Sequence, residues 1–294
     1  MASFKEMKKN RMANLESLSK QVSKLAEKPS YEDDRIWKLE RDKTGNGYAI
    51  IRFLPAAVNE DVPWVRIWTH GFKGPGGWYI ENSLTTPHGP AGENAVGKDD
   101  PVSKANTALW NSGIDSDKNI ARERRRKLSY YSNIYIVEDS LNPQNEGKVF
   151  LFRYGKKIFE KITGVMNPEF ADETPLNPFD FWEGANFKMK MRQVEGFPNY
   201  DKSEFTDVVP LSEDEKKMED IWSQQYPLNE IIEEKNFKQY AELEARFNTV
   251  IAHKGDEFVG NIEESTDVGS SEPVAPTEKT DDTLDYFKKL AEQE

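Results

Sequence analysis

Seven short runs rich in β-branched and aromatic residues constrain the fold of this chain more than any other feature. They lie at residues 35–41, 48–54, 64–70, 77–81, 132–138, 148–154 and 186–194. Gly-rich turns at 44–47 and 74–77 separate several of them. Runs of this length between turn residues are typical of strands. The pattern therefore predicts a mainly β fold with added helices, a β-barrel with insertions.

Helical periodicity predicts where the added helices lie. Apolar residues recur at three and four residues within 4–27, which predicts an amphipathic helix with a basic second side. Further helices are expected at 156–166, 212–225 and 228–248, and the Gly, Pro and Asp residues of 85–102 predict a loop.

Composition excludes several classes of protein. The 294 residues include no cysteine, which excludes disulfides, thiolate nucleophiles and thiolate metal sites. No apolar run approaches the roughly 20 residues of a membrane helix, and the first residues lack the apolar core of a signal peptide. We therefore expect a soluble intracellular protein with no membrane partner.

Charge is divided unevenly along the chain, whose net charge is −12. Residues 1–28 hold seven Lys and Arg against three Glu, and residues 118–161 hold eleven basic against five acidic residues. Residues 255–294 hold twelve acidic residues against three Lys. Because binding depends on the local field of a surface, this segregation keeps nucleic acid among the candidate ligands despite the negative total.

The acidic segment at 255–294 has the composition of a disordered tail. Its end differs, because Leu284, Phe287 and Leu290 fall three residues apart behind an acidic first turn. This spacing predicts a short amphipathic helix that docks on a partner protein. The alternative is a frayed end with incidental periodicity.

Catalytic and metal-binding motifs are incomplete in this chain. Residues 92–99 match the spacing of a phosphate-binding loop, but Asp99 stands where Ser or Thr would hold Mg²⁺. Residues 115–126 begin like a calcium loop and lack its Gly and Glu, so we interpret residues 115–119 as a polar turn. The three histidines form no acid–base constellation, and we expect no enzymatic activity.

The best candidate site lies at residues 122–136, where five cations lead into two tyrosines and a strand. Cations bind phosphates, and flat aromatic faces stack on unpaired bases. Strand alternation predicts that only one of the two tyrosines faces inward. The alternative is a basic loop before a strand whose tyrosines belong to the core. The predicted DNA-contacting residues are Arg122, Arg124, Arg125, Arg126, Lys127, Ser129, Tyr130 and Tyr131.

Two more strands combine cations with aromatic residues. Within 186–194, alternation places the cations on one face and Phe and Met on the other. We expect the three strands to contribute to one groove that follows a single strand of nucleic acid. The residues added to the predicted site are Lys148, Phe152, Arg153, Lys156, Lys188, Lys190, Arg192, Phe197 and Tyr200.

These motifs resemble the single-stranded DNA-binding (helix-destabilising) proteins of T-even-type bacteriophages. The shared phrases, in the same order and at similar spacing, are GNGYAIIRFLP, HGFKGPGGWYIE, RRKLSYYSNI, NEGKVFLFRYGKKIFEKI and PFDFWEGANFKMKMRQVEGFPNYDKSEF. The resemblance covers residues 35–210 and implies an OB-fold core. It also implies cooperative filament formation through a basic N-terminal segment, and an acidic C-terminal segment that contacts phage replication, recombination and repair proteins.

The resemblance also carries over residue by residue. Arg125, Arg126, Lys127 and Ser129 match a basic motif of that family, and Tyr130, Tyr131, Phe197 and Tyr200 match its base-contacting aromatics. Phe152 and Trp110 stand where the family has tyrosines. Self-association is implied for the N-terminal cations, which are more dispersed than the family's motif: Lys5, Lys8, Lys9 and Arg11.

The same family holds a structural zinc with one His and three Cys. The histidine matches His70, but Ser83, Asp100 and Ser103 occupy the Cys positions. Because thiolates supply most of the affinity in such sites, we expect no zinc and no other cofactor. The alternative is a different metal site composed from His70, His88, Asp99 and Asp100.

The resulting hypothesis is a non-enzymatic protein that coats single-stranded DNA cooperatively and without sequence specificity, in the cytoplasm of the infected bacterial host. It comprises a basic arm at 1–28, a DNA-binding core at 29–254 and an acidic tail at 255–294. The rival hypothesis is a phage interaction or scaffold protein whose acidic tail recruits replication enzymes. A nuclease or deaminase is disfavoured because cysteines and metal-ligand spacing are absent.

Overall fold

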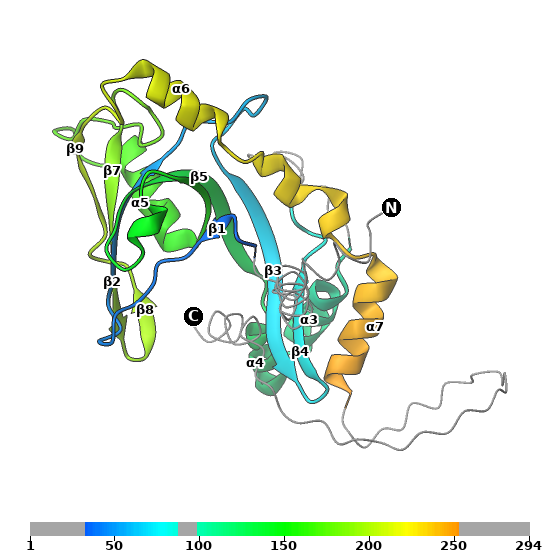
Figure 1. Ribbon diagram of the computed structural model, residues 1–294. Coiled ribbons are helices and arrows are strands. Elements are labelled where there is room, and N and C mark those ends of the chain that lie inside the picture. The colour runs from blue at the N-terminus through cyan, green and yellow to red at the C-terminus, as the bar shows by residue number, and fades with distance from the viewer. Residues whose placement is uncertain (1–32, 88–98, 253–294) are drawn as a thin grey trace, which may run out of the picture. The chain divides into compact units, whose positions relative to one another are not determined.

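The strands in the described part of the chain pair into one open sheet. The computed structural model describes residues 33–87 and 99–252. The sheet has the order β1-β6-β5-β2-β7-β8, with β3 paired to β5 and β4, and β9 paired to β7 (Figure 1). Its nine strands are β1 (Ile36–Trp37), β2 (Gly47–Phe53), β3 (Val65–Gly74), β4 (Gly77–Asn82), β5 (Lys127–Asp139), β6 (Val149–Tyr154), β7 (Ala185–Val194), β8 (Phe197–Asn199) and β9 (Glu204–Val208).

Five α-helices accompany the sheet in the described part of the chain, and the predicted class of mainly β with added helices is confirmed. They are α3 (Pro101–Asn111), α4 (Asp115–Glu123), α5 (Lys156–Met166), α6 (Glu215–Ser223) and α7 (Tyr240–Ile251), with short 3-10 helices η1 (Pro143–Asn145), η2 (Leu228–Ile232) and η3 (Glu234–Asn236). Among the described residues, no helix has the length and apolar character needed to cross a membrane.

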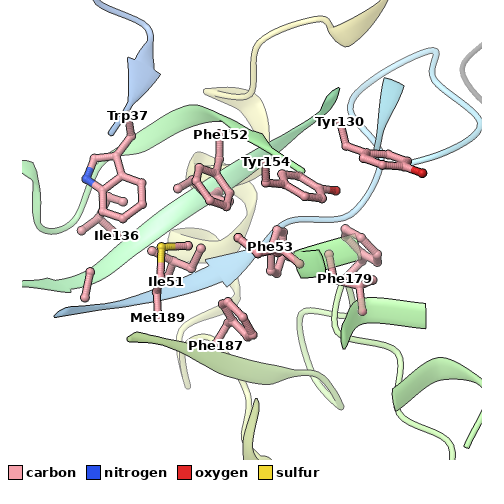
Figure 2. Close-up of a cluster of buried hydrophobic side chains, with 14 residues drawn as sticks. Trp37, Ile51, Phe53, Tyr130, Ile136, Phe152, Tyr154, Phe179, Phe187 and Met189 are labelled. Carbon is pink, nitrogen blue, oxygen red and sulfur yellow. The ribbon is translucent and has the colours of Figure 1, made fainter. Parts of the chain in front are cut away.

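The first core cluster lies between β2, β5, β6, β7 and α5 and is built around Phe53 (Figure 2). The ring of Phe53 lies 5.8 Å from that of Tyr154 and 5.7 Å from that of Phe179, measured between centroids. Alternation in β7 supplies Phe187 and Met189 to this cluster, as predicted, and leaves the cations of β7 on the other face. Truncating a buried ring such as Phe53 to Ala costs about 3–5 kcal/mol.

A second cluster joins β3, β4 and the far side of β5 to η2 and α7. The end of α7 packs directly on the β3–β4 hairpin, where the amide of Gly76 donates to the carbonyl of Val250 at 2.9 Å. A Cβ atom at Gly76 would lie 2.1 Å from the carbonyl oxygen of Thr249, so only glycine allows this approach. Figure 1 shows α7 beside this hairpin.

Strand β5 is covered on both faces, which corrects one prediction. Tyr130 belongs to the first cluster and Tyr131 to the second, and both are buried. The prediction that only one of them faces inward is wrong, because β5 separates two cores instead of one core and solvent. Both tyrosines belong to the core, as the alternative interpretation stated.

The secondary structure differs from expectation at several places. The single helix expected at 228–248 is replaced by η2, η3 and an extended link before α7, because Leu228 and Ile232 dock in the second cluster from a 3-10 helix. The supposed polar turn at 115–119 is the start of α4, whose first turn holds Asp115 and Asp117 as the helix dipole favours. Of the run 35–41, only Ile36–Trp37 pairs as a strand.

Besides α4, the elements α3, β8 and β9 were not predicted from the sequence. The start of α3 carries a readable signal, since Pro101 opens the helix and Asp100 caps it by accepting from the amide of Ser103 at 2.9 Å. The predicted basic arm at 1–28 and acidic tail at 255–294 lie outside the described residues, as do His88 and the docking residues Leu284, Phe287 and Leu290.

Candidate nucleic-acid interface

Three arginines and a tryptophan line one open hollow between α3 and the end of α4. The hollow has a volume of about 580 Å³. Its cations come from the last turn of α4 and the link to β5, and Trp110 comes from the last turn of α3. The lining residues are His70, Ser103, Asn106, Thr107, Trp110, Ala121, Arg122, Arg125 and Arg126. The structure thus joins Trp110 with three of the predicted arginines.

Two of these arginines lie over aromatic rings. The guanidinium carbon of Arg122 is 5.3 Å from the ring centroid of Trp110, and that of Arg126 is 4.4 Å from the ring centroid of Trp68. Arg126 also donates to the hydroxyl of Thr85. Contacts of this kind hold a guanidinium in place without neutralising its charge. The hollow therefore offers ordered cations beside an indole that is 50% exposed, the ring of Trp110.

Strand β3 contributes residues that the sequence reasoning did not assign to the site. Val65 and Ile67 are buried, so Arg66 and Trp68 lie on the opposite face of β3. Arg66 faces Tyr130 across the β3–β5 pairing. Burial raises the pKa of Tyr130, and the charge of Arg66 acts against that rise. The alternation of Trp and Arg in residues 64–68 was the available signal.

A second basic group surrounds the turn after β8. Asn199 lowers the pKa of the exposed Asp201 by hydrogen bonding, and the charges of Lys157, Lys161 and Arg192 lower it further. Lys161 also donates to the carbonyl of Asp201 at 3.0 Å, which joins α5 to this turn. Arg192, a predicted contact in β7, therefore creates a positive potential here together with Lys157 and Lys161 of α5, which were not among the predicted residues.

Strand β7 extends this basic group toward β9. The ammonium of Lys190 lies 2.7 Å from the carboxylate of Glu204, and its hydrogen bond and charge lower the pKa of that acid, with help from Lys188. Phe197 is exposed at the start of β8, whereas Tyr200 packs against the first cluster.

Several predicted residues lie elsewhere, which corrects the expectation of one groove containing them all. Arg153 donates to the hydroxyl of Ser129 at 3.1 Å, and both lie on the Tyr131 side of β5, opposite Tyr130. The carbonyl of Lys148 accepts from the amide of Ile136, which is nine residues along β5 from Lys127. Lys148 therefore lies toward the other end of β5.

The predicted stacking residues of β5 and β6 are core residues in this structure. Tyr130 stacks on Phe159 with ring centroids 3.9 Å apart, and Figure 2 shows it in the first cluster beside Tyr154. Phe152 is buried in the same cluster. Neither ring offers a free face for a base, because aromatic neighbours already cover them.

The side chain of Arg124 packs against aromatic residues of the second cluster. Its guanidinium carbon lies 5.6 Å from the ring centroids of Phe72 in β3 and Phe247 in α7. Burial lowers the pKa of Arg124, although the side chain stays charged at neutral pH. Arg124 thus links the end of α4 to the second cluster, and its predicted role as a DNA contact is not supported by this position. Lys156, in contrast, is exposed on α5 and lies 3.3 Å from Glu160.

The residues at the family's zinc positions do not fit a zinc ion. One oxygen of Asp100 accepts from the Ser103 amide at 2.9 Å and lies 3.1 Å from His70 Nε2. The other accepts from the Ser83 hydroxyl at 2.9 Å and the Leu84 amide at 3.2 Å. Burial opposes ionisation of Asp100, but these contacts outweigh it and hold its pKa well below the usual range. Apart from the imidazole of His70, the candidate ligands are hydroxyl and carboxylate oxygens, and the chain holds no cysteine to supply a thiolate.

Cations ordered beside aromatic rings are the features with which proteins hold single-stranded nucleic acid. Comparison with known proteins agrees with this class. Residues 45–251 match the family described as gp32 DNA binding protein like, and this chain belongs to that family. The resemblance seen in the sequence motifs is thereby confirmed.

The relatives are phage proteins named for DNA binding. The chain is 39% identical over 240 residues to the single-stranded DNA-binding protein of Enterobacteria phage T2. The matched segment covers 80% of this chain and 76% of that one. The chain is 38% identical over 239 residues to the protein of that name from Enterobacteria phage T4, with the same shares. A third, from Escherichia phage SV14, is 48% identical over 75 residues, covering 24% of this chain and 66% of that one.

Proposed function

We propose that this chain binds single-stranded DNA without sequence preference and coats it cooperatively during phage DNA replication, recombination and repair. The observation that carries the proposal is the hollow in which Arg122, Arg125 and Arg126 stand beside Trp110. The names of the relatives support the same ligand. In this proposal the chain is a binding protein and not an enzyme, and it needs no zinc or other cofactor.

The chemistry of the interface accounts for the preference for single strands. Arginines that bind phosphates release condensed counterions, so affinity falls as salt rises. Exposed rings such as Trp110 and Phe197 stack on bases, which contributes about 1–3 kcal/mol per base regardless of sequence. Paired bases offer no free face to these rings, so the duplex is disfavoured.

The proposal also covers the organisation of the chain. The sheet of the core at 29–254 is taken as an elaborated OB-fold, the arm at 1–28 as the segment that contacts a neighbouring copy on DNA, and the tail at 255–294 as the site for replication proteins. Removal of 1–28 should then abolish clustering on long strands while leaving affinity for a short oligonucleotide nearly unchanged. The proposed location is the cytoplasm of the infected host.

The acidic tail is proposed to compete with DNA for the basic interface. A tethered segment acts at high effective concentration, and its twelve acidic residues would be attracted to the cations of the hollow. Deleting 255–294 should raise affinity for single strands, most at low salt where screening is weak. An affinity that stays unchanged at low salt would leave the tail only a docking role.

The proposed function is tested by titrating the full chain with oligo(dT) at two salt concentrations, beside a mixed-sequence single strand and the matched duplex. We expect similar affinity for both single strands, much weaker binding of the duplex, and a marked drop in affinity at the higher salt. Absence of binding, or binding that ignores salt, would refute the proposal and favour the scaffold hypothesis.

A further inference from the structure

A buried set of polar contacts lies directly behind the hollow, and we propose that His70, Asp100 and Asn106 are positioning residues that hold its arginines ready for phosphate. This inference rests on the proposed function, since it assigns a role in the same interface to residues behind it. It also gives a function to the positions at which the family's zinc ligands are replaced.

The contacts converge on one backbone carbonyl. The Nδ1 atom of His70 lies 3.1 Å from the carbonyl oxygen of Arg124, and the side-chain amide of Asn106 donates to that oxygen, also at 3.1 Å. A carbonyl oxygen and a carboxylate can only accept, so Nδ1 carries a proton toward Arg124 and the ion pair with Asp100 requires one on Nε2 as well. Arg124 directly precedes Arg125 and Arg126 in the chain. Holding its carbonyl therefore holds the backbone from which those two side chains extend.

Asp100 holds in place His70 and Asn106, the two side chains that donate to the carbonyl of Arg124. It lies 3.1 Å from Nε2 of His70, and both side chains are almost completely inaccessible to solvent. It also caps α3, the helix that carries Asn106 and Trp110. One carboxylate therefore sets the orientation of the histidine on β3 and the start of the helix that forms the opposite wall of the hollow.

Positioning of this kind affects affinity because a mobile arginine must be ordered before it can hold a phosphate. Ordering a rotamer-rich side chain costs about 0.5–1.5 kcal/mol, and a preorganised side chain avoids most of that cost. The contacts at Arg124 act on the backbone, whereas the rings of Trp68 and Trp110 act on the guanidiniums of Arg126 and Arg122. The backbone of Arg126 and its guanidinium are therefore both held in place.

The first test replaces Asn106, which is only half-buried, so N106A should fold normally. We expect N106A to bind oligo(dT) about three- to tenfold more weakly, the range expected for one net hydrogen bond. Amide hydrogen exchange at residues 125–127 of the free protein should become faster. The matched control is T249A on α7, outside the lining of the hollow, whose hydroxyl donates to the carbonyl of Ala245 within its own helix. T249A should change neither quantity.

A double-mutant cycle separates positioning from a direct contact between Asn106 and DNA. In the R125A/R126A background, N106A should weaken binding no further, because the side chains that it positions are absent. A decrease as large as in the wild type would overturn the proposal, and so would unchanged exchange at residues 125–127 in N106A. If the wild type itself failed to bind DNA, the proposed function would fall, while the exchange measurement would still decide whether these contacts position the arginines.

The second variant is Asp100→Asn, which keeps an oxygen for the amide of Ser103 but removes the charge beside His70. We expect weaker binding and faster exchange at 125–127, measured well below the unfolding temperature of the variant so that only folded protein is compared. Reduced stability with unchanged binding and exchange would show that Asp100 supports the fold alone, and would remove it from the proposal.

Discussion

The guanidinium carbon of Arg126 lies 4.4 Å from the ring centroid of Trp68, so that a cation from the α4–β5 link rests on an aromatic residue of β3. This contact covers one face of the ring and leaves the charge of Arg126 intact. We therefore expect Arg126 to act on DNA through charge, with Trp68 as its support. Trp110, half exposed at the edge of the hollow, has Arg122 over one face of its ring and offers the other for stacking.

Trp110→Ala should weaken binding of oligo(dT) by about 1–3 kcal/mol, because one stacking face is removed. The dependence of affinity on salt should stay the same, since no cation is removed. Trp182→Ala is the matched control. Trp182 is similarly exposed, but it lies beside Phe181, which belongs to a different hydrophobic cluster from the first two. Equal effects of the two substitutions in fluorescence titrations would contradict the assignment of Trp110.

Arg124→Ala should lower the stability of the fold by about 1 kcal/mol while leaving the salt dependence of binding unchanged. The side chain lies near the rings of Phe72 and Phe247, and cation–π contacts of partly buried residues have this magnitude. Urea unfolding and salt-dependent titration on the same preparation measure both quantities. A reduced salt dependence with unchanged stability would return Arg124 to the DNA interface.

Tyr130→Ala should destabilise the protein by about 3–5 kcal/mol, as expected for a truncated core aromatic. Tyr130→Phe keeps the ring stacked on Phe159 and should bind oligo(dT) as the wild type does. Denaturant unfolding of both variants provides the check. If Tyr130→Ala instead kept its stability and bound DNA more weakly, the ring would have to leave the core on binding DNA, as the sequence motif first indicated.

Wild-type protein should unfold at the same temperature with and without a metal chelator, because the contacts of Asp100 with His70 and Ser83 occupy the position of a metal. The triple variant S83C/D100C/S103C combines three thiols with the imidazole of His70 and should bind one zinc ion per chain. Its unfolding temperature should then depend on the chelator. Calorimetry with a zinc assay tests both, and a chelator effect on the wild type would contradict the account.

The strands were predictable because runs rich in β-branched and aromatic residues lie between turn residues, and in β7 alternation also located every buried residue of 187–191. The stretch at 228–248 was not, because Leu228 and Ile232 are four residues apart, as on an α-helix, yet dock in the second cluster from a 3-10 helix. Tertiary packing decided between local alternatives there.

The site was predictable only where its members are neighbours in the chain. The arginines at 122–126 are adjacent in sequence, and three of them line the hollow together with Trp110, which the resemblance had singled out. That Arg126 meets Trp68 depends on how β3 pairs with β5, and that Arg122 meets Trp110 depends on how α4 packs on α3, which no local pattern contains. The pairing of β5 with β6 places Arg153 beside Tyr131, on the face opposite Tyr130.

Arg122 and Arg126 are proposed to bind DNA phosphates, and the salt dependence of binding measures how many phosphates they neutralise. The logarithm of the binding constant for oligo(dT) is measured against the logarithm of salt concentration for the wild type, for R122Q/R126Q and for K148Q as a control cation at the other end of β5. We predict that the slope of R122Q/R126Q is smaller in magnitude by about 1.4, at about 0.7 for each phosphate that is no longer neutralised, and that K148Q keeps the wild-type slope. A wild-type slope in R122Q/R126Q would contradict the account.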